Sequence, residues 1–241
     1  YLLAAQGFPV TVFEAFHALG GVLRYGIPEF RLPNDLIDDV VGKIKLLGGR
    51  FVPNFVVGKT ATIEELREAG FWRVFVGTGA GLPRFMDVPG EHYLNVMSAN
   101  EFLTRVNLMK GLREDFETPL PETAGKQVLI IGGGNTAIDA VRAAKSLGIA
   151  EVTRVYRGAQ AGMSGYAHEW EAALLQGVRG EWRAMPTAFD GDNRVARVRC
   201  IRTDHKKQPI AGSDFSLPAD LVLLAIGQGT LGQLFAPLEG I

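Results

Sequence analysis

The sequence predicts an α/β fold that contains two nucleotide-binding βαβ units. Along the 241 residues, helical and strand patterns alternate and are separated by 30 glycines and 12 prolines. An apolar run at residues 127–131 leads into Gly-Gly-Gly-Asn-Thr-Ala and then into a helical pattern, which is the order that a dinucleotide-binding unit requires. Residues 1–15 read as the end of a helix, a stop at Gly7 and a strand closed by Glu14. We therefore expect two Rossmann-like domains.

The first elements follow from periodicity and from the residues that begin and end helices. Strands are predicted at 10–13 and 50–53. Between them, an irregular segment ends at Pro33, and a helix at 35–47 follows with Asn34 as its N-cap. One face of this helix is apolar and consists of Leu36, Val40, Ile44 and Leu47.

A further helix, strand and linker are predicted before the complete glycine turn. Thr62 is expected to cap a helix at 63–69, whose first-turn glutamates interact favourably with the helix dipole. The mainly apolar run at 72–76, which contains Arg73, predicts a strand that ends in Gly-Thr-Gly-Ala. Residues 112–125 contain acidic residues and prolines without apolar periodicity, so we interpret them as a linker.

The complete turn begins a second run of alternating elements. Residues 128–131 predict a parallel strand that is buried on both faces. Strands at 182–189 and 195–202 are expected to form a hairpin, because the Asp-Gly-Asp-Asn between them is typical of a turn. The remaining predicted elements are a helix at 135–147, a strand at 151–156, a helix at 168–175 and a buried strand at 220–226.

Composition excludes several classes of protein. Lys and Arg number 25 against 26 Asp and Glu, which leaves a net charge of −1 and no basic block for nucleic acid. No apolar run approaches the ~20 residues of a membrane span, and the start lacks a signal-peptide pattern, so we expect a cytoplasmic protein without membrane contact. The single cysteine, Cys200, excludes an internal disulfide or a four-cysteine iron–sulfur site in this segment. We interpret it as a small apolar residue on a strand.

The complete glycine turn is the strongest indication of a ligand. Gly132 permits a tight strand-to-helix turn, Gly134 lets a pyrophosphate approach the backbone, and Ala137 keeps the helix close to the strand. Asn135 and Thr136 place backbone N–H groups at the positive end of the helix dipole. The alternative is a glycine-rich turn that only packs, but the flanking strand and helix favour a nucleotide site.

Arg157 ends the second strand of this unit, where an acidic residue would bind a ribose hydroxyl. A guanidinium can instead bind a 2′-phosphate through two hydrogen bonds, which favours NADPH over NADH. A solvated arginine at a strand end is the alternative, and no second basic residue follows until Arg179. We expect Arg157→Ala to weaken NADPH binding much more than NADH binding.

Glu14 is the acidic counterpart at the end of a strand in the first unit. Its carboxylate can accept hydrogen bonds from an adenosine ribose, and Gly20 and Gly21 follow closely. An exposed surface glutamate is the alternative. The glycine turns at 77–80 and 225–228 are weaker candidates, because each can be a simple chain reversal. Two nucleotide units in one chain suggest a protein that passes hydride between two bound dinucleotides.

No side chain is assigned a catalytic role. The four histidines lack the spacing of metal ligands, and no serine-nucleophile or paired-carboxylate pattern is present. We therefore expect neither a metal site nor acid–base hydrolysis. In hydride transfer between two cofactors, the protein supplies binding and orientation.

Residues 20–33, Gly-Gly-Val-Leu-Arg-Tyr-Gly-Ile-Pro-Glu-Phe-Arg-Leu-Pro, resemble the NADPH-dependent glutamate synthase small-subunit family. That family includes the flavin module of dihydropyrimidine dehydrogenase and related ferredoxin:NADP oxidoreductases. The resemblance spans nearly the whole chain. It continues through residues 76–80, 88–90, 132–139, 155–157 and 225–228.

This resemblance implies an α/β flavoprotein in which an FAD-binding domain, residues 1–118 and 226–241, is split around an NAD(P)H-binding domain, residues 119–225. The chain lacks an initiator Met and a natural-looking end, so we interpret it as a fragment whose FAD-binding domain is truncated at both ends. The family's first glycine turn would precede Tyr1, and its flavin-closing Gly-Gly-Asp would follow Ile241. Gly158 also stands where family members often carry a second basic residue.

The resemblance also implies which residues contact the cofactors. The implied FAD contacts are Glu14, Gly21, Leu23, Arg31, Val57, Gly77, Thr78 and Gly79. The implied NADPH contacts are Gly133, Gly134, Asn135, Thr136 and Arg157, with Ala225, Ile226 and Gly227 near the nicotinamide. Gly20 and Gly132, which open the two glycine turns, complete the set of candidates.

The function that the resemblance implies is hydride transfer between NADPH and FAD. Electrons would then pass to iron–sulfur clusters or a larger partner subunit outside this chain. Ferredoxin:NADP oxidoreductase and dihydropyrimidine dehydrogenase are alternatives to glutamate synthase within the enzyme class. A nucleotide-binding subunit or redox-sensing module without turnover is the alternative outside it. We expect the isolated fragment to bind FAD weakly.

Overall fold

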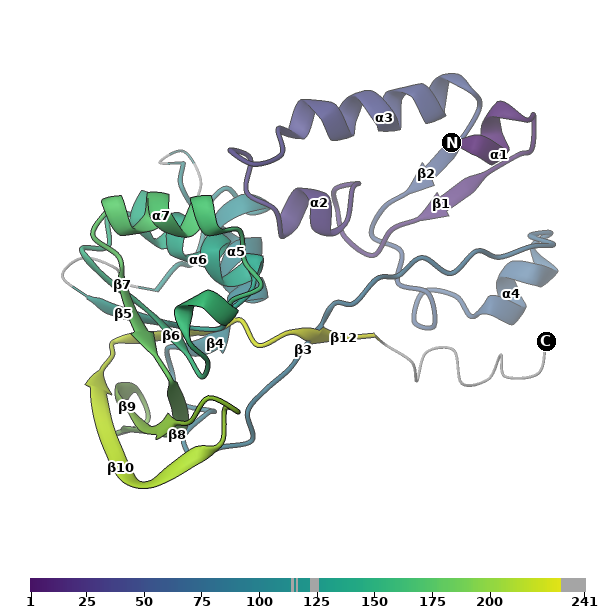
Figure 1. Ribbon diagram of the computed structural model, residues 1–241. Coiled ribbons are helices and arrows are strands. Elements are labelled where there is room, and N and C mark those ends of the chain that lie inside the picture. The colour runs from purple at the N-terminus through teal and green to yellow at the C-terminus, as the bar shows by residue number, and fades with distance from the viewer. Residues whose placement is uncertain (114, 116, 122–125, 231–241) are drawn as a thin grey trace. The chain divides into compact units, whose positions relative to one another are not determined.

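A computed structural model describes residues 1–113, 115, 117–121 and 126–230. The chain divides into two compact units, which are Tyr1–Leu82 with Gly229–Ile241, and Pro83–Gln228. Two short strands, β3 (Leu82–Pro83) and β12 (Gln228–Gly229), pair where the chain passes into and out of the second unit (Figure 1).

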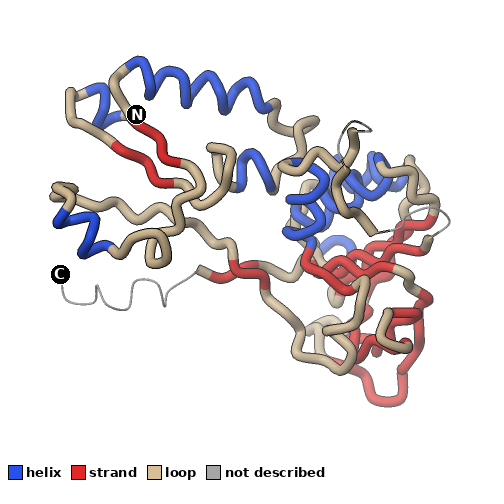
Figure 2. The backbone as a smooth tube through the Cα atoms, turned by 180° about the vertical axis from the view of Figure 1, so that it is seen from behind, coloured by secondary structure: helices blue, strands red, loops and turns tan. Residues whose placement is uncertain are grey.

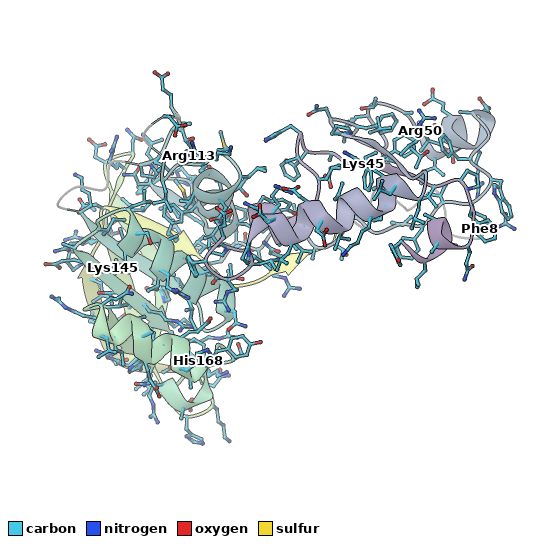
Figure 3. The ribbon with its side chains drawn as sticks, turned by 90° about the horizontal axis from the view of Figure 1, so that it is seen from above. Phe8, Lys45, Arg50, Arg113, Lys145 and His168 are labelled. Carbon is cyan, nitrogen blue, oxygen red and sulfur yellow. The ribbon has the colours of Figure 1, made fainter. Side chains whose placement is uncertain are left out.

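The first unit contains a two-stranded parallel sheet of β1 (Thr11–Phe13) and β2 (Arg50–Val52). Each residue of β1 has a partner in β2, and Phe13 also packs against the rings of Phe55 and Phe71, with centroids 4.4 and 5.4 Å away. The helices of this unit are α1 (Leu2–Ala5), α2 (Val22–Tyr25), α3 (Asn34–Leu46) and α4 (Ile63–Glu68). Figure 3 labels Lys45 on α3 and Arg50 at the start of β2.

The starts of two helices test the capping predictions. The Thr62 hydroxyl accepts a hydrogen bond from Glu65 N (3.1 Å), and the Glu65 carboxylate accepts one from Thr62 N (2.7 Å). This capping box confirms Thr62 as the cap of α4. The prediction for Asn34 was wrong, because α3 begins at Asn34 and Pro33 holds the N-cap position without a side-chain hydrogen bond. The proline ring is suited to the extended backbone before a helix, but it carries no acceptor.

Residues 72–76 do not form the predicted strand. They belong to neither a helix nor a strand, and Phe75 is 91% exposed. A strand needs a neighbouring backbone to complete its hydrogen bonds, and within the part of the chain that the structure describes, no strand pairs with this segment. The prediction failed because an apolar run signals burial but does not supply the neighbour.

The second unit is built on a parallel sheet with the strand order β4-β11-β5-β6-β7. The strands are β4 (Val96–Ser98), β5 (Gln127–Ile131), β6 (Glu151–Tyr156), β7 (Arg179–Trp182) and β11 (Leu221–Leu224). The predicted strands at 128–131, 151–156 and 220–226 are confirmed, apart from small shifts at their ends. Because all pairings are parallel, the carboxyl ends of these strands lie at one edge of the sheet.

Alternate residues of β5 supply two apolar cores on opposite faces of this sheet. Val128 and Ile130 pack with three helices, whereas Leu129 and Ile131 pack against a second, antiparallel sheet. The helices are α5 (Ala99–Asn107), α6 (Asn135–Ser146) and α7 (Ala167–Leu175). Figures 1 and 2 show the helices and the second sheet on opposite sides of the parallel sheet. Of these helices, α6 and α7 match the predictions, and α5 was not predicted.

The second sheet has the order β10-β9-β8, with β8 (Ala184–Gly191), β9 (Val195–Thr203) and β10 (Pro209–Pro218). The predicted hairpin is confirmed by the antiparallel pairing of β8 with β9. The single strand expected at 182–189 was wrong, because Trp182 ends β7 and Arg183 adopts a left-handed backbone (φ +50°). A strand cannot continue through that conformation, so the chain changes sheets there.

Residues 83–113 pack with the second unit, whereas the sequence analysis placed them in the first domain. Strand β4 pairs with β11, and α5 shares the helical core with α6. In the predicted linker at 112–125, the described positions lie outside helices and strands, and the other positions are outside the described residues. The assignment of one cofactor to each domain stays a prediction.

Candidate functional site

The complete glycine turn lies at the carboxyl edge of the parallel sheet, between β5 and α6. Gly132 has φ +154°, and a Cβ atom there would lie 2.3 Å from the carbonyl oxygen of Ala225. A Cβ atom at Gly133 would lie 2.5 Å from the ring of Tyr156. Both positions therefore require glycine. The strand–turn–helix geometry that the sequence predicted is present.

Backbone N–H groups at the start of α6 have no partner among the residues that the structure describes. Gly134 holds the N-cap position, and no side chain caps the helix. The first N–H groups of a helix have no partner within it, and those of residues 133–136 make no hydrogen bond to another described residue. With the positive end of the helix dipole, such groups form a ready anion site.

A second loop, residues 163–166, supports this turn. Gly165 N donates to Gly133 O (3.1 Å), and Tyr166 N donates to Oδ1 of Asn135 (3.0 Å). The Asn135 side chain thus holds the loop and leaves its own backbone N–H free for a ligand. His168, labelled in Figure 3, follows on α7, and its ring stacks on Tyr166 with centroids 5.8 Å apart.

Arg154, in β6, is a candidate that the sequence analysis missed. Its side chain is 0% exposed, Nε donates to Gly132 O (2.9 Å), and Nη2 donates to Gly134 O (3.1 Å). The guanidinium lies 5.4 Å from the centroid of the Trp170 ring, and Nη1 has no partner among the described residues. Burial lowers the pKa of Arg154 to about 10, so it stays protonated at neutral pH. A charged residue in the middle of the predicted strand at 151–156 was the signal that could have revealed it.

Arg157 follows β6 and is exposed. Its carbonyl accepts a hydrogen bond from the buried hydroxyl of Thr203 (2.5 Å). Lys207, from the turn between β9 and β10, reaches the same place. Its Nζ lies 5.5 Å from the centroid of the Tyr156 ring, and a Cβ atom at Gly158 would lie 3.1 Å from its Cε. The fold therefore brings a second basic side chain, Lys207, beside Gly158. In the sequence, no second basic residue follows Arg157 until Arg179.

The turn after β11 lies beside the glycine turn. Ala225 N donates to Ile131 O (2.8 Å), and the carbonyl oxygen of Ala225 is the atom that crowds Gly132. Ile226 packs with the core between the two sheets, and Gly227 has φ +111°. The structure thus brings these three predicted site residues to the same sheet edge as Gly132.

In the first unit, Glu14 follows β1 and lies near α2. Its Oε1 accepts a hydrogen bond from Phe16 N (3.0 Å), and the rings of Phe16 and Tyr25 lie 4.8 Å apart. Burial, assisted by the Glu14 carboxylate, raises the pKa of Tyr25. The structure therefore places Glu14, the residue predicted to bind a ribose, near α2, the short helix that follows Gly20 and Gly21.

The glycine pair Gly20 and Gly21 immediately precedes α2. Gly20 has φ +117°, and a Cβ atom there would lie 2.8 Å from Cγ2 of Ile37. Gly21 holds the N-cap position with φ +54°, and a Cβ atom there would meet nothing within 4 Å beyond its own chain neighbours. Leu23 is a partly exposed residue of α2.

The other predicted residues of the first unit lie on separate segments. Arg31 N donates to Pro28 O (2.9 Å) in the stretch before α3, and Val57 forms an isolated bridge with Ala61. Gly77, Thr78 and Gly79 are exposed and follow the segment that lacks its expected strand. Gly79 has φ +68°. The described residues give this last turn no strand to position it.

Cys200 lies in β9 within the core between the two sheets, which confirms its interpretation as a buried strand residue. Burial raises the pKa of its thiol to about 12, so the reactive thiolate is scarce near neutral pH. Among the described residues, no group of three or more His, Cys, Asp and Glu side chains is placed to hold a metal ion. None of the described helices has the length and apolar character needed to cross a membrane.

These features define a class of protein. A parallel strand, a glycine turn and a helix with unpaired N–H groups at the carboxyl edge of a sheet form the nucleotide site of Rossmann-type α/β proteins. The chain belongs to the pyridine nucleotide-disulphide oxidoreductase family, whose model matches residues 3–237. The predicted fold class and the predicted resemblance are thereby confirmed.

Two curated relatives indicate the branch of the family. The chain is 35% identical over 236 residues to the glutamate synthase [NADPH] small chain of Azospirillum brasilense, covering 93% of this chain and 49% of the relative. It is 34% identical over 240 residues to the NADP(+)-dependent formate dehydrogenase subunit beta of Moorella thermoacetica, covering 95% of this chain and 32% of the relative. The chain thus spans about half, or less, of these relatives' length.

Solved structures agree with this fold. The FprA protein of Mycobacterium tuberculosis, in complex with NADPH, superposes with a TM-score of 0.72 at 21% identity, covering 94% of this chain and 67% of that one. The thioredoxin reductase of Lactococcus lactis superposes with a TM-score of 0.65 at 15% identity, covering 98% of this chain and 75% of that one. At such identities, the likeness concerns the fold.

Proposed function

We propose that this chain forms the cofactor-binding part of an NADPH-dependent flavin oxidoreductase, in which hydride passes between NADPH and FAD. The observation that carries this proposal is the turn at the start of α6, where positions 132 and 133 require glycine and the N–H groups of residues 133–136 have no partner among the described residues. Membership of the pyridine nucleotide-disulphide oxidoreductase family supports it. The name of the Azospirillum relative, an NADPH enzyme's small chain, points to the same cofactor.

In this proposal, the second unit holds NADPH. The residues present fit its pyrophosphate, because the backbone N–H groups of Gly133, Gly134, Asn135 and Thr136 are available at the positive end of α6. Residues 225–227 would lie near the nicotinamide, since they share the sheet edge with Gly132.

The 2′-phosphate of NADPH would bind between two cations. Arg157 is exposed at the end of β6, and Lys207 reaches the neighbouring Gly158 from another turn. A guanidinium and an ammonium together can neutralise the 2′-phosphate of NADPH. The uncharged 2′-hydroxyl that NADH carries at the same position would gain much less from two cations. We therefore assign NADPH rather than NADH to this site.

The first unit would hold FAD through Glu14 and the glycine pair Gly20 and Gly21. One carboxylate oxygen of Glu14 is used by Phe16 N, and the other makes no hydrogen bond to a described residue, so it fits a ribose hydroxyl. The space beside Gly21 is open. The remaining proposed FAD contacts are Gly20, Leu23, Arg31, Val57, Gly77, Thr78 and Gly79.

When bound, the two cofactors supply the redox chemistry, with reduced nicotinamide as hydride donor and flavin as acceptor. The chain's own residues bind and orient, and we assign no proton transfer to any side chain. Electrons would leave to iron–sulfur clusters or to a larger subunit. The names "small chain" and "subunit beta" of two relatives support assembly with such partners.

The direct test is NADPH oxidation by the full chain with added FAD and an artificial electron acceptor, accompanied by calorimetric titration of each cofactor. Because we expect this chain to bind FAD weakly, we expect tight binding of NADPH and turnover only when FAD is added in excess. Binding of cofactors without turnover would instead favour a nucleotide-binding subunit or a redox-sensing module. If the chain bound neither cofactor, the proposal would be wrong.

The 2′-phosphate assignment has its own test. Arg157→Ala and Lys207→Ala should each raise the Kd for NADPH by roughly 10-fold or more, since a charge-assisted hydrogen bond contributes about 1.5–3 kcal/mol. The Kd for NADH should change little. Arg179→Ala is a matched control, because Arg179 is exposed and pairs only loosely with Glu151 (3.9 Å). Equal losses for NADPH and NADH would contradict the assignment.

A further inference from the structure

Arg154 is a buried cation without an anion. Charged side chains are almost never fully buried unless they are paired, yet no carboxylate among the described residues forms an ion pair with this guanidinium. Its partners are two uncharged carbonyl groups, and Nη1 has none. Taking such a charge out of water costs free energy, which indicates a role beyond packing.

The two carbonyl groups that Arg154 binds belong to the nucleotide turn. They are those of Gly132 and Gly134. In a trans peptide, the C=O of one residue and the N–H of the next point in opposite directions, and the described chain contains no cis peptide bond. Holding the carbonyl of Gly132 therefore directs the N–H of Gly133 away from Arg154. In the same way, holding the carbonyl of Gly134 directs the N–H of Asn135 away from it.

The N–H groups oriented in this way are two of the unpaired donors at the start of α6. The charge of Arg154 lies on the opposite side of the same two peptide groups, within a low-dielectric interior where electrostatic interactions are strong. An anion on the donor side would therefore interact with both oriented N–H groups and with the positive charge behind them. No other described residue contributes a buried cation to this turn.

We propose that Arg154 is a positioning residue of this nucleotide site, which fixes the two peptide planes of the turn and supplies the buried positive charge for the dinucleotide's pyrophosphate. This inference rests on the proposed binding of NADPH at the turn. It adds a second source of specificity for phosphate, separate from the 2′-phosphate site at Arg157. The Arg154 guanidinium also makes a cation–π contact with the Trp170 ring, 5.4 Å from its centroid.

The test compares a ligand that has a pyrophosphate with one that has no phosphate at the turn. NADPH is the first, and 2′-AMP, which carries only the 2′-phosphate, is the second. In the full chain, Arg154→Met should raise the Kd for NADPH by at least tenfold and the Kd for 2′-AMP by less than threefold. Arg154→Lys, which keeps the charge but loses the paired hydrogen bonds, should give an intermediate loss for NADPH.

A matched control is Arg179→Met, which removes an exposed arginine of the neighbouring strand β7 and leaves the contacts of the turn intact. It should leave the ratio of the two Kd values close to that of the unmodified chain. If Arg154→Met does not fold, the ratio measured for Arg154→Lys decides the matter. An unchanged ratio with intact NADPH binding would overturn the role of Arg154 alone, whereas absence of NADPH binding by the unmodified chain would overturn the proposed function as well.

Discussion

Strand β5 lies between two hydrogen-bonded neighbours, β11 and β6, whereas β1 pairs with β2 alone among the described residues. The side chains of β5 are buried after its first residue, and those of β1 are half-buried or exposed. Each strand leads toward a glycine turn and a helix. The two regions thus begin from similar local sequence and differ in what surrounds them.

The difference teaches how a nucleotide turn is fixed. The turn after β5 is held by Ala225, which follows β11, and by Tyr156 and Arg154 of β6. At Gly21, no atom lies close to where a side chain would begin. Glycine is therefore enforced by packing at Gly132 and Gly133, and by backbone conformation alone at Gly21. The turn's own sequence does not distinguish these cases.

The largest expected effect contrasts the cores of the two units. Leu223 is 0% exposed in β11, and Leu223→Ala should destabilise the second unit by about 2–5 kcal/mol. Val74 is 42% exposed in the segment that lacks its strand, and Val74→Ala should cost less than about 0.5 kcal/mol. Denaturant unfolding followed by segment-resolved hydrogen exchange measures both. Similar losses for the two variants would remove the contrast between the units.

The next effect concerns the glycine turn itself. Gly132→Ala would place a Cβ atom 2.3 Å from Ala225 O, whereas Gly148, also at positive φ, has no atom within 4 Å. We expect Gly132→Ala to destabilise the second unit by about 1–3 kcal/mol more than Gly148→Ala, because overpacking adds to backbone strain. NADPH titration of both variants should show a weakened site only for Gly132→Ala. A turn that tolerated the extra carbon as well as Gly148 does would show that packing is not what enforces glycine there.

The smallest effect tests local order in the first unit. Thr62→Ala removes one half of the capping box of α4 and should cost about 1 kcal/mol. Glu65→Gln keeps an acceptor for Thr62 N and should change the stability by less than about 0.5 kcal/mol. Amide exchange in α4 reports both. If Thr62→Ala left the exchange of α4 unchanged, neighbouring contacts rather than the cap would hold this helix.

The sequence was most informative where local pattern and tertiary surroundings agree. Strands β5 and β6 and helix α6 were predicted because their apolar positions match the positions that the fold buries. Residues 72–76 are also apolar apart from Arg73 but lack a strand partner, so the same reasoning failed. The change of sheets at Arg183 could not be predicted, because arginine has no preference for a left-handed backbone.

The site shows the same limit. The glycine turn and Arg157 follow strands directly, so their place at the sheet edge was predictable from chain order. Lys207 reaches Gly158 through the pairing of β9 with β10, and no local pattern indicates that contact. Arg154 was overlooked because charged residues in strands usually point to solvent, whereas here the guanidinium satisfies carbonyls of the turn.

The pairing of β3 with β12 has a consequence for how such proteins are assembled in evolution. The second unit is one continuous stretch, and Arg84 N donates to Gly227 O (3.1 Å), so its first and last residues adjoin. A module whose ends meet can be spliced into a single surface loop of a host without stretching it. One recombination event would then transfer the entire module between genes.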